Sequence, residues 1–273
     1  MTGKSILYVS SVLSPYSPET PLSIAASKVP KVIHSRGNDV RIFMPRFGVI
    51  NERRHQLHEV IRLSGINLII NDIDQLLLIK VASMPGSRLQ VYFIDNEEYF
   101  KRKAIYEDES GQFFSDNDER ALFFTKGVLE AVRKLNWAPD IIHVYGWLSF
   151  LIPLYVKVHY KDDPIFQGAK IVASIYDQPF KGSLNKNISK KIRFDGIKPK
   201  YLKHLEDPDF INLTKQCIEF SDGVVKGEDP IPEGIETYIG QNKIKVLTHT
   251  SIEETAMIYK QLFSKETVLE QLV

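Results

Sequence analysis

The stretch Ser5-Ile6-Leu7-Tyr8-Val9-Ser10 is a short apolar run that begins and ends with serine. It has the length of a buried strand and is too short for the apolar core of a signal peptide or for a membrane-spanning helix. Residues 22–36 then carry apolar side chains at helical spacing, and Gly37 ends that helix. The segment from Asp39 to Met44 predicts a second strand, which Pro45 ends. This strand–helix–strand order predicts a βαβ unit and decides the fold class.

The rest of the chain repeats the alternation of short β-branched runs with helical patterns. The spacing predicts strands over 140–144, 170–175, 223–226 and 244–247, helices over 118–135, 147–160, 209–220, 232–240 and 252–272, and antiparallel additions over 66–70, 76–81 and 89–94. Residues 179–208 are rich in Lys, Pro, Gly and Asn and predict a long excursion, either functional or disordered. We therefore expect one α/β domain over residues 1–273: a Rossmann-like, doubly wound, mostly parallel sheet with helices on both faces.

Composition gives no indication of a nucleic-acid or membrane partner. The net charge is +1, with 43% hydrophobic and 25% charged residues, which is ordinary for a soluble globular protein. A single cysteine, Cys217, excludes an internal disulfide and suits a reducing compartment, so a cytoplasmic location is expected. No phosphate-binding loop or dinucleotide fingerprint occurs in the sequence, and no cofactor is expected.

Two polar clusters have structural explanations. The acidic run from Asp116 to Glu119 precedes a predicted helix, where capping by Asp116 or Asn117 is favoured over a metal or acid–base site. Arg120 either lines a cleft or is a solvated first-turn residue. The pair His55 and His58 has no further ligand cluster nearby, so no metal site is expected.

Several blocks resemble a known family. They are Tyr8-Val9-Ser10-Ser11, Pro15-Tyr16-Ser17, Arg36-Gly37-Asn38-Asp39-Val40-Arg41, Met44-Pro45-Arg46-Phe47-Gly48, Asp116-Asn117-Asp118-Glu119-Arg120 and Leu135-Asn136-Trp137-Ala138-Pro139-Asp140. Together they resemble family 5 glycosyltransferases, the ADP-glucose-dependent glycogen and starch synthases, over most of residues 4–240. The blocks follow one another with the spacing of that family.

The resemblance implies one half of a two-domain GT-B glycosyltransferase, without the C-terminal domain that carries most nucleotide-sugar contacts. It implies glucosyl transfer to an α-1,4-glucan as the family reaction, and an α-glucan or malto-oligosaccharide as ligand. A homodimer or a separate C-terminal domain is a further expected partner. Family motif positions place His143, Trp147 and Asp177 at catalytic positions and Asp116, Asn117, Arg120, Tyr176 and Gly182 at substrate-binding positions.

The first loop departs from the family motif. Where the family has Lys-x-Gly-Gly-Leu, this sequence has Pro18-Glu19-Thr20-Pro21-Leu22. Glycines let backbone N–H groups approach a diphosphate, and lysine adds positive charge. Proline has no N–H, and a glutamate repels phosphate. The sequence predicts that this loop does not bind ADP-glucose phosphates.

Two further motifs have lost polar groups. The family run His-x-His-Asp-Trp-His becomes His143-Val144-Tyr145-Gly146-Trp147-Leu148, so the histidine that the resemblance assigns to the donor glucose is Leu148. We expect His143 to be a core histidine and Trp147 to open a helix and pack the end of the sheet. A later His-Asn pair becomes Tyr176-Asp177.

The aromatic residues along 92–114 suit either core packing or contacts to sugar rings, with packing favoured: Tyr92, Phe93, Tyr99, Phe100, Tyr106, Phe113 and Phe114. Three functions therefore stay open. They are a transferase completed by a separate domain, a non-catalytic glucan-binding or regulatory relative, and an interaction domain without sugar binding. On the lost loop and histidine chemistry, the chain alone is expected to be inactive.

Overall fold

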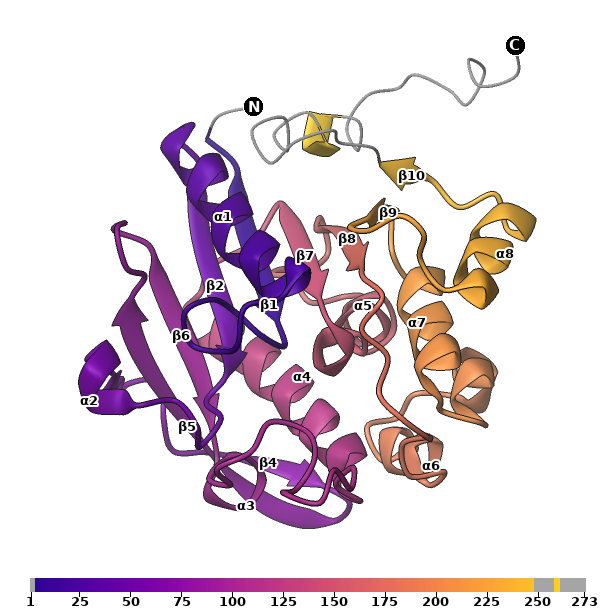
Figure 1. Ribbon diagram of the computed structural model, residues 1–273, viewed down its shortest axis with the longest axis horizontal. Coiled ribbons are helices and arrows are strands. Elements are labelled where there is room, and N and C mark those ends of the chain that lie inside the picture. The colour runs from indigo at the N-terminus through magenta and orange to yellow at the C-terminus, as the bar shows by residue number, and fades with distance from the viewer. Residues whose placement is uncertain (1–2, 248–257, 261–273) are drawn as a thin grey trace.

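The computed structural model describes residues 3–247 and 258–260 (Figure 1). The predicted helix over 252–272 lies outside these residues, apart from one helical turn at 258–260. In the described part of the chain a mixed sheet has the strand order β10-β9-β8-β7-β1-β2-β6-β5-β3, and β4 pairs with β5. The strands span β1 (Ser5–Ser10), β2 (Asp39–Pro45), β3 (His58–Glu59), β4 (Ile66–Ile70), β5 (Ile73–Ser83), β6 (Gln90–Asp95), β7 (Ile141–Tyr145), β8 (Lys170–Ile175), β9 (Gly223–Lys226) and β10 (Val246–Leu247).

The parallel part of the sheet is doubly wound about β1. From β1 the chain proceeds to β2 and β6 on one side and later returns to β7, β8, β9 and β10 on the other. Because right-handed crossovers in opposite directions place their helices on opposite faces, α1 (Pro21–Ser35) covers one face. The helices α4 (Asn117–Lys134), α5 (Ile152–Leu154) and α7 (Phe210–Glu219) cover the other (Figure 1). This arrangement confirms the predicted α/β class.

The first helix agrees with its prediction over 22–36 to within one residue at each end, since it spans Pro21–Ser35. Thr20 is the N-cap, Pro21 takes the first helical position, and Ser23 completes a capping box with Thr20. Leu22, Ala26, Val29 and Ile33 are buried on one face of the helix. Gly37, which follows the helix, has φ +80°, a conformation that glycine adopts without strain.

The antiparallel additions lie at one margin of the sheet. β6 pairs with β2 in parallel, whereas β5 pairs with both β6 and β4 in antiparallel. Asn71 and Asp72 form the turn between β4 and β5, and both have positive φ, which Asn and Asp tolerate better than most residues. Two short helices, α2 (Glu52–His55) and α3 (Glu97–Phe100), lie in the connections of this margin.

The predicted continuous helix over 147–160 is wrong. A 3-10 turn, η1 (Trp147–Ser149), is followed by α5 and then by a π-helical turn, η2 (Tyr155–His159). Pro153 sits in the first turn of α5 and cannot donate a backbone hydrogen bond there. The helical pattern is therefore correct in position but is divided into three short pieces.

The excursion over 179–208 is folded onto the body of the protein. It contains α6 (Ile188–Arg193) and the 3-10 turns η3 (Pro199–Tyr201) and η4 (Lys203–Leu205). Ile188, Ile192, Leu202 and Leu205 are buried beneath it. After α7 and β9, the helix α8 (Glu233–Gln241) leads to β10.

Candidate functional site

A cavity of about 680 Å³ opens beyond the carboxyl ends of β1, β7 and β8. This is the edge of an α/β sheet where ligands bind, next to the strand about which the sheet is doubly wound. Its lining comes from the loop after β1, the loop 103–114, the turn after β7, the loop after β8 and the start of α7. Loops that follow four different strands, β1, β6, β7 and β8, thus contribute to one cavity.

Aromatic rings form the walls of this cavity. Phe113 stacks on Phe180 with ring centroids 4.9 Å apart and planes 14° apart. Trp147 lies 5.1 Å from Phe180 and 4.9 Å from Tyr106, and Phe180 also lies 5.9 Å from Phe210. The rings come from four separate segments, so tertiary packing brings them together. Flat apolar faces of this kind suit the apolar faces of sugar rings.

The floor of the cavity depends on Gly146. This residue has φ +77°, and a Cβ there would lie 2.8 Å from the Ser11 hydroxyl oxygen. The Ser11 oxygen accepts a hydrogen bond of 2.9 Å from the backbone N–H of Leu148. Tyr106 also hydrogen-bonds Ser11. Burial raises the pKa of Tyr106 above its usual range, so its hydroxyl stays protonated. The hydrogen bond between Leu148 and Ser11 therefore holds the loops after β1 and β7 together beneath the cavity.

A small hairpin over 106–114 carries two of the aromatic rings. Phe114 N–H donates to the Tyr106 carbonyl, and Glu107 pairs with Phe113 as an antiparallel bridge. Asp108 closes the tip, because its carboxylate accepts hydrogen bonds from the Ser110 hydroxyl and from two backbone N–H groups. These hydrogen bonds lower the pKa of Asp108. The hairpin is thus ordered by its own turn chemistry.

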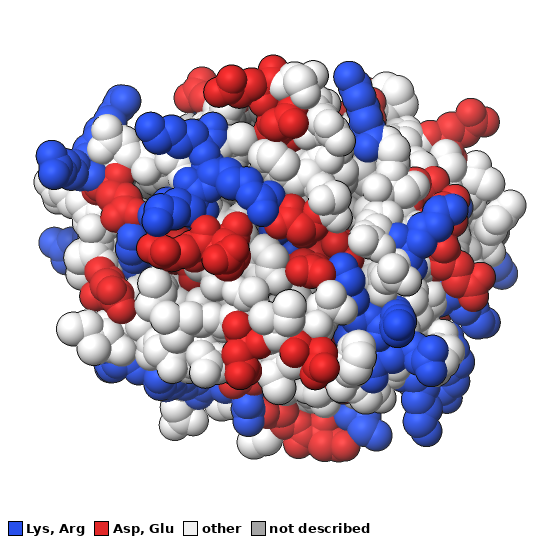
Figure 2. Space-filling model, turned by 90° about the horizontal axis from the view of Figure 1, so that it is seen from below, with Lys and Arg blue, Asp and Glu red and all other residues white. Residues whose placement is uncertain are grey.

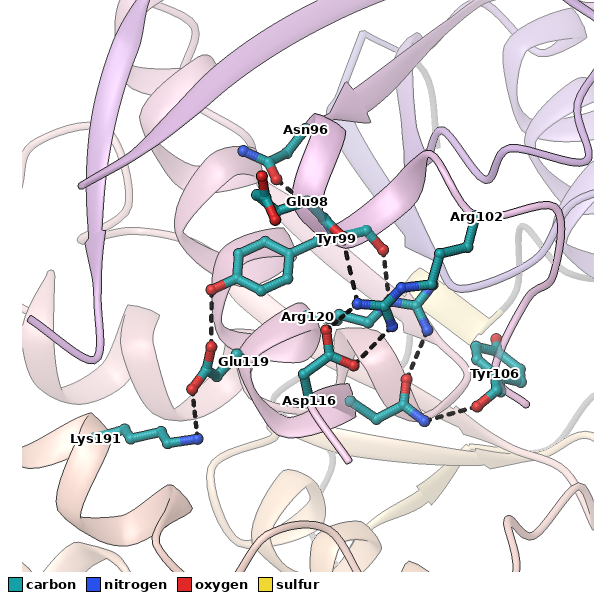
Figure 3. A network of polar contacts seen from close by, with 10 residues as sticks. Asn96, Glu98, Tyr99, Arg102, Tyr106, Asp116, Glu119, Arg120 and Lys191 are labelled. Carbon is teal, nitrogen blue, oxygen red and sulfur yellow. Dashed lines mark hydrogen bonds and ion pairs between the residues drawn. The ribbon is translucent and has the colours of Figure 1, made fainter. Parts of the chain in front are cut away.

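A polar network supports the loop that leads into the hairpin (Figure 3). Arg102 pairs with the Asp116 carboxylate through both terminal nitrogens, and hydrogen bonding to Asp116 raises the pKa of Arg102. Asp116 occupies the N-cap position of α4, as predicted, but its side chain makes no cap hydrogen bond. The prediction of side-chain capping is wrong for Asp116 because Arg102 binds that carboxylate instead.

Arg120 is completely buried, so the solvated alternative for this residue is wrong. Its Nε donates to the Tyr99 carbonyl at 2.8 Å, and its Nη1 donates to Asn117 Oδ1 at 2.6 Å (Figure 3). Asn117 in turn donates to the Tyr106 carbonyl at 2.8 Å. Burial lowers the pKa of Arg120 to about 10. Arg120 and Asn117 therefore hold the hairpin backbone in place from behind the cavity.

A buried lysine joins the 179–208 excursion to α4. Lys191 of α6 contacts Asp118 at 2.6 Å and Glu119 at 2.7 Å, and its side chain is 7% exposed. Glu119 also accepts a 2.9 Å hydrogen bond from the Tyr99 hydroxyl. Although burial opposes the charge, hydrogen bonds to the two carboxylates raise the pKa of Lys191. The acidic run thus pairs with Arg102 and Lys191.

His143 lies inside the sheet, as predicted for a core histidine. It is 1% exposed, and its ring nitrogens contact the Tyr259 hydroxyl and the Ser174 hydroxyl, each at 2.8 Å. Tyr8 contacts the same Tyr259 hydroxyl at 2.6 Å. His143 is not among the residues that line the cavity.

The loop after β8 contributes Tyr176 but not Asp177 to the cavity lining. Tyr176 packs its ring against Gly227, where a Cβ would come within 2.2 Å of the ring. Burial raises the pKa of Tyr176 above its usual range. Asp177 is exposed and donates its backbone N–H to Glu228, and Gly182 is an exposed turn residue with φ +76°.

At the N-terminus of α1, side chains of the first turn and its N-cap residue already bond backbone N–H groups. Thr20 Oγ1 accepts from the Ser23 N–H at 3.1 Å, and Ser23 Oγ accepts from the Thr20 N–H at 2.9 Å. Pro21 has no N–H, and Glu19 is exposed beside the loop. The backbone donors that could bind a phosphate at such a helix start are therefore reduced in number.

The described residues contain no cluster of three or more His, Cys, Asp or Glu side chains that could hold a metal ion. Cys217 is buried, and burial raises the pKa of its thiol, so it is a packing residue. Within the described part of the chain, no helix is long and apolar enough to cross a membrane.

Of the predicted site residues, Trp147 and Tyr176 line the cavity, and Asp116, Asn117 and Arg120 support its hairpin from behind. Phe180 and Phe210 also line the cavity and were not predicted as site residues. In the aromatic set over 92–114, Tyr92, Phe93, Tyr99 and Phe100 are buried, whereas Tyr106 and Phe113 line the cavity.

The doubly wound sheet, with a cavity at the carboxyl ends of its central strands, is that of a GT-B glycosyltransferase domain. The family model described as "Starch synthase catalytic domain" matches residues 5–238. The chain belongs to this family.

Curated relatives agree with this assignment. A glycogen synthase of Chlorobium luteolum is 38% identical over 188 residues, covering 68% of this chain and 38% of the relative. A glycogen synthase of Pelodictyon phaeoclathratiforme is 34% identical over 239 residues, covering 85% of this chain and 48% of the relative. The chain thus matches less than half the length of these relatives.

A solved structure shares the fold. The catalytic domain of starch synthase IV from Arabidopsis thaliana, bound to ADP and acarbose, superposes with a TM-score of 0.73 at 17% identity. The similarity covers 93% of this chain and 53% of that one.

Proposed function

We propose that this chain is a glucan-binding member of the glycogen and starch synthase family that binds a linear α-1,4-glucan in the aromatic cavity and does not transfer glucose by itself. The observation that carries the proposal is the set of rings around the cavity: Tyr106, Phe113, Trp147 and Phe180. The cavity is large enough for a small ligand and has the mixture of apolar faces and rim polar groups that such sites use.

The rim supports a neutral polyhydroxyl ligand. Lys103, Glu107, Asp108, Glu109 and Lys181 surround the aromatic walls. Both signs of charge are present, and hydroxyl groups can donate to carboxylates and accept from ammonium groups. The three carboxylates disfavour a strongly anionic ligand such as a nucleoside diphosphate.

The first loop argues against donor binding by this half of the family fold. In the Thr20–Ser23 capping box the two side chains bond two of the backbone N–H groups that a phosphate would require. Glu19 adds negative charge at the same place, and Pro18 stands at the lysine position that the family resemblance implies. These features support weak or absent binding of ADP-glucose.

The second motif supports the lack of transfer. Leu148 stands at the histidine position of the family motif and is completely buried. An apolar side chain cannot donate a hydrogen bond to a reacting sugar. The remaining histidine of this motif, His143, is engaged by Tyr259 and Ser174 in the interior.

Calorimetric titration of the purified chain with maltoheptaose and, separately, with ADP-glucose tests this function. The proposal expects saturable binding of the oligosaccharide and no heat from ADP-glucose. Tight ADP-glucose binding would overturn the donor argument, and absence of oligosaccharide binding would overturn the glucan argument.

A further inference from the structure

A second surface, separate from the aromatic cavity, combines exposed apolar side chains with opposite charges on its two sides. It lies at the lower edge of the molecule in Figure 1, where the β4–β5 hairpin lies beside α6. Lys126 joins these elements, because its Nζ donates to the Ile69 carbonyl at 2.8 Å and pairs with Asp195 at 2.5 Å. The two parts of the surface are thus held side by side.

The middle of this surface is an apolar strip formed by Ile69, Leu76 and Phe194. These side chains are 57%, 47% and 59% exposed. In the β4–β5 register Asn67 faces Leu76 and Ile69 faces Asp74, so Ile69 and Leu76 share one face of the hairpin. Phe194 immediately precedes Asp195, the residue that Lys126 holds. Exposed apolar side chains gathered in this way mark an interaction site.

On one side of the strip lies a basic stripe formed by Lys186, Lys190 and Arg193. Lys190 and Arg193 lie three residues apart on α6, so helical spacing places them on one face, and Lys186 lies just before the helix. The opposite face, with Ile188 and Ile192, is buried. All three basic residues are exposed, and Lys190 and Arg193 have no ion-pair partner among the described residues.

The basic stripe belongs to a strongly basic segment. Residues 181–203 contain eight of the 35 Lys and Arg residues and one of the 34 Asp and Glu residues. The remainder of the chain is therefore acidic overall. Figure 2 shows this side of the molecule from below. Lys and Arg gather on the right, the side on which α6 lies, and again at the upper left, and Asp and Glu lie across the middle.

On the other side of the strip lies an acidic groove of about 550 Å³ between β5 and the start of α3. Asp74, Glu97 and Glu98 supply its carboxylates, and Ile73 and Leu76 supply apolar lining. The three carboxylates are exposed, and Glu97 pairs with Lys101 at 3.4 Å, which leaves Asp74 and Glu98 as the groove's main negative charges. The groove therefore offers negative charge and an apolar floor, whereas the basic stripe offers positive charge and the Phe194 ring.

We propose that two copies of this chain pair through this face about a two-fold axis that passes along the apolar strip. The basic stripe of each copy then lies against the acidic groove of the other, and the two apolar strips meet at the axis. An isologous interface requires a self-complementary surface, and opposite charges on the two sides of an apolar strip are such a surface.

Other occupants match only half of the surface. A nucleic acid or an anionic membrane would neutralise the basic stripe but would be repelled by Asp74, Glu97 and Glu98. An acidic protein has the same disadvantage. A second copy satisfies both sides at once and buries the apolar strip, so the observations favour it.

The test is sedimentation velocity with complementary charge reversals. Variant one carries Lys190→Glu and Arg193→Glu, variant two carries Asp74→Lys and Glu98→Lys, and Lys28→Glu, an exposed lysine of α1, is the matched control. Wild type and the control are expected to form dimers. Each reversal variant alone is expected to raise the dimer dissociation constant by at least about tenfold, since like charges then face each other.

An equimolar mixture of the two reversal variants restores both contacts, because each reversed stripe then faces an oppositely charged groove. The proposal expects the mixture to recover the dimer. Circular dichroism before mixing establishes that both variants are folded. A monomeric wild type, a dimer that neither reversal weakens, or a mixture that stays monomeric would each overturn the proposal.

Discussion

Phe113 and Phe180 stack face to face, with centroids 4.9 Å apart, although 67 positions in the chain separate them. Phe113 comes from the 106–114 hairpin and Phe180 from the loop after β8, and both line the cavity. The stack therefore joins two loops that the sheet alone would leave independent. Stacked pairs contribute about 0.5–1.5 kcal/mol beyond their buried area, so the contact helps to fix the shape of the site.

Removing either ring of this stack is expected to weaken oligosaccharide binding. Phe113→Ala and Phe180→Ala should each lower maltoheptaose affinity about tenfold, which corresponds to about 1.4 kcal/mol. Both rings are half-buried, so the fold should survive. Calorimetry measures the affinity, and Phe220→Ala, a half-buried phenylalanine outside the cavity, is the control. Equal affinity in all three variants would contradict a role of the stack in binding.

The capping box predicts a stability effect at the first loop. Thr20→Ala removes the acceptor for the Ser23 N–H and should lower the free energy of unfolding by about 1 kcal/mol. Urea denaturation measures this change, and Thr20→Ser, which keeps the hydroxyl, should restore most of it. If Thr20→Ala is as stable as wild type, the hydroxyl does not cap α1.

Partial restoration of the family motif tests why the first loop fails to bind phosphate. The triple substitution Pro18→Lys, Thr20→Gly and Pro21→Gly supplies a positive charge and returns two backbone N–H groups. We expect ADP binding by this variant to exceed that of wild type, measured by calorimetry. Glu19→Gln alone should give a smaller gain, since it removes only the repulsion. If neither variant binds ADP more tightly than wild type, residues outside the first loop prevent phosphate binding.

The buried ion pair between Lys191 and Asp118 predicts strong destabilisation when one partner is removed. Lys191→Met leaves the Asp118 carboxylate, which is completely buried, without its cation and should cost roughly 3–5 kcal/mol. Chemical denaturation measures the loss. The double variant Lys191→Met with Asp118→Leu should recover part of it, because the completely buried carboxylate is removed and only the partly exposed Glu119 loses its cation. A single variant as stable as wild type would contradict this role.

The lowered pKa of Asp108 predicts an acid sensitivity of the hairpin. A carboxyl whose pKa is lower in the folded state stabilises that state above its unfolded pKa, and the contribution is lost as the pH falls below about 4. Oligosaccharide affinity should therefore persist down to about pH 4 and fall below it. Asp108→Asn should already show weakened binding at neutral pH and a flatter profile. A variant with the steep profile of wild type would exclude Asp108 as the cause.

Much of the fold was predictable because it depends on local patterns. The run from Ser5 to Ser10 is buried on both faces of a parallel sheet, so it reads as a continuous apolar strand. Gly37 marks the end of α1, Pro45 marks the end of β2, and the run over 170–175 predicts β8. The division of the 147–160 helix was not predictable, because apolar periodicity does not distinguish α-helical from π-helical turns.

The site was only partly predictable because its walls meet through long-range packing. Trp147 and Tyr176 were found through motif positions, and Tyr106 and Phe113 through aromatic density. Phe180 lies in the motif segment that contains Tyr176 but was not singled out, and Phe210 carries no local signal. Arg120 was expected in the cleft or in solvent and is instead buried beneath the hairpin, because Tyr99 and Asn117 provide its acceptors from within the interior.

The central claim is that the aromatic cavity binds α-glucan while the first loop does not bind the sugar nucleotide. The most direct measurement is a pair of calorimetric titrations of the same wild-type preparation with maltoheptaose and ADP-glucose, repeated for Phe180→Ala. The account predicts oligosaccharide binding that weakens about tenfold in Phe180→Ala, and no ADP-glucose binding in either protein. Tight ADP-glucose binding, or oligosaccharide binding that Phe180→Ala leaves unchanged, would contradict it.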